Sequence, residues 1–222
     1  SVQKLQELGI QPDVLVLRTE HNLDDELRRK VALFCNVSPE AVVQSIDVPS
    51  IYEVPLKMQE QKLDEIILKK TEVDYSNNPS DLTGWTNFVN RFKSATESVK
   101  IGIVGKYVEL QDAYKSITEA LTQSAAYNDR KVDLQMIQAA NITEANVAEQ
   151  LKDLDGVIVA PGFGQRGVEG KFIALKYARE NDIPTLGLCL GMQCMVIEFA
   201  RNVLGYKNAN STELEITTKY NV

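Results

Sequence analysis

Histidine, cysteine and long apolar runs are all scarce in this chain of 222 residues, and each scarcity excludes something. The only histidine is His21, so the sequence offers almost no choice of a catalytic imidazole base. The three cysteines form an odd set without framework spacing, which excludes a disulfide-stapled fold and fits a reducing, cytoplasmic setting. No apolar run approaches the about 20 residues of a membrane span, and no signal-peptide pattern opens the sequence, so no membrane partner is expected.

An excess of positive charge is also lacking. The chain has 24 Lys and Arg against 31 Asp and Glu, a net charge of -7, which argues against a nucleic-acid partner. Nucleotides are not excluded, because local backbone N–H groups and a few cations suffice to hold phosphates. The start at Ser1 without methionine and the end in "TTKYNV", with no closing element, lead us to expect a fragment.

Two stretches of alternating helices and strands, separated by a polar segment, organise the chain. Residues 1–70 read as helix, strand, helix, strand and helix, which predicts a parallel pair of strands and a domain part of α/β type. Residues 71–98 are rich in turn formers and then amphipathic, so they are predicted to be a linker with a short helix. A second domain is predicted over 99–222.

The second domain is predicted to be a doubly wound parallel sheet. Its apolar runs alternate with helical patterns, and the predicted strands are 99–104, 132–137, 156–161 and 184–190. In such sheets ligands bind at the carboxyl ends of the strands. Three segments follow predicted strands in this way: "GKY" after the first, "APGFG" after the third and "GLCLG" at the fourth.

Cys189 lies between two glycines where the last of these strands meets a helix. The spacing Gly-x-Cys-x-Gly is the thiol form of a nucleophile elbow, in which glycines allow a sharp turn. A helix beginning directly behind Cys189 favours the thiolate, and the N–H of Leu190 is a candidate oxyanion donor. The alternative is an inert cysteine in a buried strand, and that alternative is the expected role of Cys194.

The loop "APGFGQRGVEG" (160–170) follows the neighbouring strand and contains four glycines. Such a loop can bring backbone N–H groups close to a ligand, and the N–H of Gly162 is a candidate second oxyanion donor. Glycine-rich loops are common, so this one is weak evidence alone. It does not match the Walker phosphate-binding pattern, because no Gly-Lys-Ser/Thr follows.

Several motifs together resemble the CTP synthase family over essentially the whole chain. "VGKYVELQDAYKSITEAL", "GFGQRGVEGK", "GLCLGMQ" and "NANSTE" are similar to the glutaminase domain of that family. "GIQPDVLVLRTE", "RRKVALFCNV" and "DVPSIYEVP" are similar to the end of its synthetase domain. The resemblance implies that 1–70 is the C-terminal part of a synthetase domain and 99–222 the first part of a class I glutamine amidotransferase domain.

By this resemblance, UTP is aminated to CTP at the expense of ATP, with ammonia taken from glutamine through a thioester on Cys189. Gly162 and Leu190 would hold the oxyanion by their N–H groups. The resemblance implies further roles: Phe163, Gln193 and Glu213 for glutamine, Arg18, Lys30 and Asp47 for nucleotides, and Arg166 for coupling to the activator GTP. Glu213 as a solvated acid and Arg166 as a surface cation are the plain alternatives. Mg²⁺ ligands are expected outside this chain, CTP is expected as feedback inhibitor, and the full-length protein is expected to form a homotetramer.

Two features depart from the family pattern. The position of the first of two glycines before the phenylalanine is Pro161, which has no N–H. If Gly162 supplies the donor, Pro161→Gly should change the glutaminase rate by less than about tenfold, and a gain beyond about a hundredfold would contradict this. The family's His-x-Glu pair is expected beyond Val222, and His21 is not assigned to it. Another class I amidotransferase, or a degenerate and inactive nucleotide-binding or regulatory relative, remains the alternative.

Overall fold

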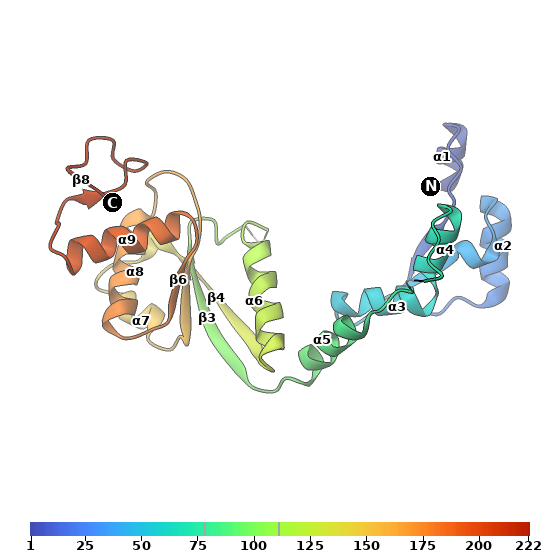
Figure 1. Ribbon diagram of the computed structural model, residues 1–222, viewed down its shortest axis with the longest axis horizontal. Helices are drawn as coiled ribbons and strands as arrows, with labels where there is room; N and C mark the ends of the chain where they lie inside the picture. The colour runs from blue at the N-terminus through green and yellow to red at the C-terminus, as the bar shows by residue number, and fades with distance from the viewer. Residues whose placement is uncertain (78, 111) are drawn as a thin grey trace. The chain divides into compact units, whose positions relative to one another are not determined.

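The computed structural model describes residues 1–77, 79–110 and 112–222 (Figure 1). The chain divides into two compact units, Ser1–Asn90 and Arg91–Val222, and each is described by itself. Among the described residues, no helix combines the length and the apolar character that a membrane crossing requires.

The N-terminal unit contains two parallel strands surrounded by helices. Strand β1 (Leu15–Thr19) pairs with β2 (Val42–Ile46), with Leu15 opposite Val42, so the predicted parallel pairing is confirmed. The helices are α1 (Val2–Glu7), α2 (Asp25–Cys35), α3 (Val54–Glu60), α4 (Leu63–Lys70) and α5 (Thr83–Ser94), with 3-10 turns at Pro39–Ala41 and Ile51–Glu53. Asp24 caps α2 by accepting a hydrogen bond from the N–H of Leu27 at 2.7 Å.

One predicted helix of this unit is divided into two. The apolar pattern predicts a single helix that follows a break at Pro55 and runs to about Lys70, but α3 ends at Glu60 and α4 begins at Leu63. Lys62, between them, has a φ of 59°. The side chain of Gln61 accepts from the backbone N–H of Gln44 at 2.8 Å and donates to its carbonyl. This pairing with β2 is tertiary, so periodicity cannot reveal the break. Pro55 lies in the first turn of α3, where its missing N–H costs nothing.

The core of the N-terminal unit is small. Leu15, Ala32 and Val42 form its buried apolar cluster. A second contact is aromatic: the indole N–H of Trp85 donates to the carbonyl of Tyr52 at 2.7 Å, and the rings lie edge to face. Trp85 thus packs against Tyr52 within this unit.

The C-terminal unit is built on a parallel sheet in the order β4-β3-β5-β6 (Figure 1). Its strands are β3 (Ser98–Gly105), β4 (Lys131–Gln138), β5 (Gly156–Val159) and β6 (Thr185–Gly187), and a small parallel pair follows, β7 (Ala209–Asn210) with β8 (Tyr220–Asn221). Its helices are α6 (Lys115–Tyr127), α7 (Val147–Leu151), α8 (Val168–Glu180) and α9 (Leu190–Asn202), with a 3-10 turn at Ala139–Asn141.

Helices cover both faces of this sheet. Figure 1 shows α6 on one side of the strands and α7, α8 and α9 on the other. The larger apolar cluster joins β5 to α8 and α9 through residues such as Val159, Phe172 and Ile197. The cluster on the α6 side includes Ile103 and Tyr114. The predicted doubly wound α/β fold is therefore confirmed.

Candidate active site

The strand order brings three loops to one edge of the sheet. The chain leaves β3 toward β4 on one side and later places β5 and β6 on the other, so the direction of winding reverses beside β3. Loops at the carboxyl ends of strands flanking such a reversal form the ligand crevice of open α/β sheets. The segments there are Lys106–Tyr107 after β3, 160–167 after β5 and Leu188–Cys189 after β6.

Cys189 is held in a backbone conformation that L-residues rarely adopt. Its φ is 54° and its ψ is -113°, and it is the N-cap residue of α9. The side chain is exposed, whereas its neighbour Leu190 is buried. A non-glycine residue in such a region costs of order 1–3 kcal/mol and is found where function requires it. The strained, exposed cysteine at a strand-to-helix turn is the geometry of a nucleophile elbow.

The two flanking glycines are required by space. A Cβ on Gly191 would lie 2.0 Å from the carbonyl oxygen of Val159, and one on Gly187 would lie 2.6 Å from the backbone of Gly191. Both distances are far below van der Waals contact. The start of α9 can therefore lie against Val159 of β5 only if Gly191 lacks a side chain, and against the end of β6 only if Gly187 lacks one.

The oxyanion donors predicted from the sequence are free to donate. Gly162 has a φ of 156°, which glycine adopts readily. Within the described part of the chain, neither the N–H of Gly162 nor that of Leu190 is hydrogen-bonded to a protein acceptor. Pro161 precedes Gly162 and leaves this N–H in place.

Two buried lysines hold the loop that contains Gly162. Lys106 is 5% exposed, and its ammonium donates to the carbonyls of Phe163 and, at 2.9 Å, Gly164. Lys171 is 0% exposed and donates to the carbonyl of Ala160 at 2.6 Å. Burial lowers the pKa of both ammonium groups. Arg166 lowers the pKa of Lys106 further.

Two of the residues expected to bind glutamine are in direct contact. The side-chain amide of Gln193, in α9, donates to a carboxylate oxygen of Glu213 at 2.9 Å. The other amide atom, Oε1 of Gln193, is buried and has no partner among the described residues. A buried acceptor without a donor costs free energy, so the site suits a ligand that brings N–H groups. An α-ammonium group would satisfy both Gln193 and Glu213.

Phe163 and Arg166 lie in the same loop. The ring of Phe163 is 81% exposed and is thus available to a ligand. Arg166 donates to the carbonyl of Lys106 at 3.3 Å, and its guanidinium lies 5.5 Å from the ring centre of Tyr107. The loop also contacts the C-terminal segment, because Gln165 donates to the carbonyl of Leu214 at 2.6 Å.

Cys194 differs from Cys189 in every respect that matters for reactivity. It is fully buried in the apolar cluster of α8 and α9. Burial raises its pKa to about 11, although Lys171 and Arg201 oppose that rise. A protonated and buried thiol is inert, so the packing role expected for Cys194 agrees with its surroundings.

In the N-terminal unit, two of the three expected nucleotide-binding residues are in contact. Arg18, in β1, forms an ion pair of 3.2 Å with Asp47, which follows β2. Both side chains are half or more exposed, at 85% and 50%. Lys30 lies in α2 and is exposed, and among the described residues no hydrogen bond or ion pair joins it to this pair.

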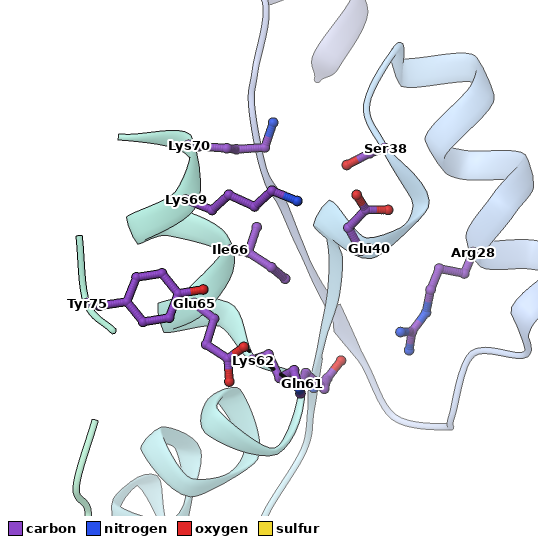
Figure 2. A pocket seen from close by; sticks show the side chains of 10 residues that line it. All are labelled: Arg28, Ser38, Glu40, Gln61, Lys62, Glu65, Ile66, Lys69, Lys70 and Tyr75. Atoms are coloured by element: carbon purple, nitrogen blue, oxygen red, sulfur yellow. Dashed lines mark ion pairs between the residues drawn. The ribbon is translucent and has the colours of Figure 1, made fainter. Parts of the chain in front are cut away.

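A separate cavity of about 540 Å³ lies in the same unit (Figure 2). Figure 2 shows side chains from α2, α4 and the turn before β2 directed toward it, with Tyr75 at its side. The lining residues are Arg28, Ser38, Glu40, Gln61, Lys62, Glu65, Ile66, Lys69, Lys70 and Tyr75. None of the three expected nucleotide-binding residues is among them. Four of these residues are cationic and two are acidic, and the sequence pattern does not indicate this cavity.

Comparison with known proteins decides the family. The model of "Glutamine amidotransferase class-I" matches residues 109–220, which include the elbow and the loop after β5. The chain belongs to the class I glutamine amidotransferase family. The model of "CTP synthase N-terminus" matches residues 1–73 of the same chain. The resemblance to CTP synthase drawn from the sequence motifs is thereby confirmed.

Relatives of this amidotransferase chain carry the same two parts. A CTP synthase of Porphyromonas gingivalis is 61% identical over all 222 residues, and one of Bacteroides fragilis is 62% identical. The chain spans 41% and 42% of the length of these relatives. A solved structure, titled as the Trypanosoma brucei CTPS glutaminase domain with bound acivicin, is 37% identical. It has a TM-score of 0.52 and covers 56% of this chain and 48% of that one.

The two loop-holding lysines of this amidotransferase chain were not singled out by sequence reasoning. The segment "GKY" follows a predicted strand, but nothing in the pattern indicates that Lys106 is buried, and Lys171 reads as an ordinary helical lysine in "VEGK". The signal that was available is their position: one follows β3 directly, and the other lies in the first turn of the helix after the glycine-rich loop. Among the described residues, no group of three His, Cys, Asp or Glu gathers as a metal site would require.

Proposed function

We propose that this chain is part of a CTP synthase, in which it carries the nucleophile of the glutaminase reaction. In the whole enzyme, ATP would phosphorylate O4 of UTP, and ammonia from glutamine would displace that phosphate to give CTP. The chain matches part of the length of relatives that are named CTP synthase, and these names support the overall reaction. One observation supports the role of Cys189 most strongly: the strained, exposed conformation of this residue at the start of α9.

The glutaminase step begins with attack of the Cys189 thiolate on the amide carbon of glutamine. The new C–S bond turns the carbonyl oxygen into an oxyanion, which the N–H groups of Gly162 and Leu190 would bind. Loss of one such donor typically costs about 3 kcal/mol of barrier height. Collapse of the intermediate breaks the C–N bond, ammonia leaves with a proton from a general acid, and a thioester remains. Water then hydrolyses the thioester to glutamate and frees the thiol. The general acid and base are proposed to be the family's His-x-Glu pair.

The substrate's amino-acid end would lie on Gln193 and Glu213. The unpartnered Oε1 of Gln193 and the Glu213 carboxylate can both accept from the α-ammonium group. The exposed ring of Phe163 would pack against the carbon chain of the substrate. These contacts distinguish free glutamine from a peptide-bound glutamine, whose α-nitrogen carries no charge.

The remaining assignments concern nucleotides and regulation. Arg18, Lys30 and Asp47 are proposed to bind nucleotide, and the Arg18–Asp47 contact supports a shared site for two of them. Arg166 is proposed to couple the glutaminase site to GTP, because it bonds to the carbonyl of Lys106, which itself holds the oxyanion loop. Mg²⁺ as a cofactor, CTP as feedback inhibitor, a homotetramer and a cytoplasmic location complete the proposal. Three free cysteines agree with a reducing compartment.

Labelling with acivicin tests the role of Cys189. The full-length protein is treated with this electrophilic glutamine analogue, and the modified residue is identified by mass spectrometry. We expect label on Cys189 alone, protection by free glutamine, and no label on Cys189→Ala. Label on Cys194 or Cys35, or no protection by glutamine, would contradict the assignment.

Activity measurements with two nitrogen donors test the overall reaction. Cys189→Ala should abolish CTP formation from glutamine while CTP formation from added ammonia is retained, because ammonia bypasses the glutaminase step. If neither donor yields CTP with the unmutated protein, the alternative of a degenerate relative is correct. If glutamine is hydrolysed but UTP is not aminated, another class I amidotransferase is the better description.

A further inference from the structure

Lys171 is a buried cation for which the described part of the chain offers no acidic partner. It lies in the first turn of α8 and is 0% exposed, a condition in which lysine is rarely found unless it is paired. Among the described residues, no carboxylate lies within ion-pair distance of its ammonium group. Its ammonium group donates a hydrogen bond to the Ala160 carbonyl at 2.6 Å. The desolvation of this ammonium group therefore costs free energy that no ion pair offsets among the described residues.

The pKa of the Lys171 ammonium is affected by the two thiols of the elbow region. Burial lowers the pKa of Lys171, Cys194 raises it, Lys106 lowers it and Cys189 raises it. The titratable groups that act on this ammonium are therefore Cys194 of α9, Cys189 at the elbow and Lys106 after β3. Of the two thiols, Cys194 is kept protonated by its own burial, which raises its pKa to about 11. Cys189 is the exposed thiol, and it is the proposed nucleophile.

The hydrogen bond of Lys171 fixes the start of the oxyanion loop. Ala160 is fully buried, and its N–H donates to the carbonyl of Val104 at 2.9 Å, so both of its peptide groups are held. Pro161, which follows, has a restricted φ. The next N–H in the chain belongs to Gly162, the proposed oxyanion donor. Lys106 holds the carbonyls of Phe163 and Gly164 beyond it. The donor segment thus lies between two ammonium anchors.

We propose that Lys171 is a positioning residue for glutamine hydrolysis: it anchors the Ala160 carbonyl so that the Gly162 N–H faces the oxyanion, and its charge offsets the Cys189 thiolate. This inference rests on the proposed function, since it assumes that Cys189 is the nucleophile. It also gives a physical reason for burying a lysine where an apolar residue of similar length would pack without penalty.

The test compares Lys171→Met, which keeps the length of the side chain, with Lys171→Gln, which keeps a donor without a charge. Lys176→Met is the matched control, because Lys176 lies on the same helix in an exposed pair with Glu144 at 3.4 Å. Each variant is made in the full-length protein. The readouts are kcat/KM for glutamine hydrolysis, CTP formation from ammonia, and the rate of Cys189 alkylation by iodoacetamide between pH 6 and pH 10.

We expect Lys171→Met to lower kcat/KM for glutamine by roughly tenfold to a hundredfold, the scale of a misplaced donor. CTP formation from ammonia should be unchanged. The midpoint of the alkylation profile should move upward by about one pH unit in both Lys171 variants, because both lack the positive charge. Lys171→Gln should recover part of kcat/KM if its amide reaches the Ala160 carbonyl. The Lys176→Met control should behave like the unmutated protein.

Two outcomes would overturn the proposal. If kcat/KM changes less than about threefold, or if it falls while the alkylation profiles of all variants coincide, Lys171 serves packing alone. Should Lys171→Met fail to fold, Lys171→Gln decides by the same alkylation profile. Failure of the proposed function is recognised separately: the unmutated protein would then hydrolyse no glutamine, whereas the alkylation experiment would still report on the charge beside Cys189.

Discussion

Cys189, the proposed nucleophile, shows at the scale of one residue how an exposed thiol can be presented at the expense of stability. Asn36 and Lys62 also have positive φ, but their positive ψ values of 48° and 33° place them in the left-handed helical region. Cys189, with a ψ of -113°, lies outside that region. Its side chain is exposed, so packing does not repay the strain. The strain is instead the condition for presenting the thiol above the start of α9.

Replacing Cys189 by glycine should therefore stabilise the protein. Relative to Cys189→Ala, which retains a Cβ, Cys189→Gly should raise the free energy of unfolding by about 1–2 kcal/mol, because glycine relieves the strain. Urea denaturation of both inactive variants measures the difference. Equal stabilities, or a less stable glycine variant, would show that the elbow is not strained.

Cys194 predicts a dependence of stability on alkaline pH. Burial raises its pKa to about 11 from an unfolded value of 9.0. Between these values the unfolded chain loses the thiol proton while the folded chain keeps it, so unfolding releases a proton and stability falls as pH rises. The full effect of a shift of this size is about 3 kcal/mol.

The comparison with Cys194→Ala isolates this effect. The cavity that the alanine leaves costs stability at every pH, whereas only the unmutated protein has the titrating thiol. The stability advantage of the unmutated protein, measured by urea denaturation, should shrink by about 2–3 kcal/mol between pH 8 and pH 11. Parallel curves over this range would contradict the raised pKa.

At the scale of elements, the packing of α9 against β5 depends on Gly191. A Cβ there would lie 2.0 Å from the Val159 oxygen and 2.8 Å from its carbonyl carbon, both backbone atoms that cannot rotate away. Gly191→Ala should reduce the free energy of unfolding by about 3 kcal/mol or more and should abolish acivicin labelling of Cys189.

Gly205→Ala is the matched control for this change. Gly205 also lies in the C-terminal unit and has a φ of 78°, but a Cβ there meets nothing within 4 Å. It should cost only about 1 kcal/mol, from the backbone conformation alone, and should leave labelling intact. If both variants lose the same stability, close approach of α9 to β5 is not what requires Gly191.

The elements themselves were largely predictable from the sequence, because alternation of apolar strands and amphipathic helices is a local pattern. The elbow was predictable too, because the two glycines of Gly-x-Cys-x-Gly indicate a tight turn in which side chains would clash. The division at Lys62 was not, because it depends on Gln61 pairing with Gln44 of β2. The burial of Lys106 and Lys171 was also not predictable from the sequence. Whether a lysine is buried depends on which loops cover it, and the periodicity of apolar residues carries no information on that. For Gln193 and Glu213, only the family resemblance indicates a shared role in glutamine binding, and it does not predict the hydrogen bond between them.

At the scale of the whole molecule, the two units have cores of very different size. In the N-terminal unit the buried cluster consists of Leu15, Ala32 and Val42. In the C-terminal unit an extensive cluster joins the sheet to α8 and α9, and a further one lies under α6. Since apolar burial is the main stabilising contribution and each unit has its own cluster, the units are expected to unfold in separate transitions.

The single tryptophan makes these transitions separable. Trp85 lies in the N-terminal unit and donates to the carbonyl of Tyr52, so its fluorescence reports on that unit. Cys194 is fully buried in the C-terminal unit, so its reaction with a thiol reagent in a Cys35→Ser/Cys189→Ser background reports on the other. On heating, the fluorescence transition should come several degrees before exposure of Cys194, because the smaller core loses stability first. Coincident midpoints would mean instead that the chain unfolds as one cooperative unit, and that neither cluster alone determines the stability of its part.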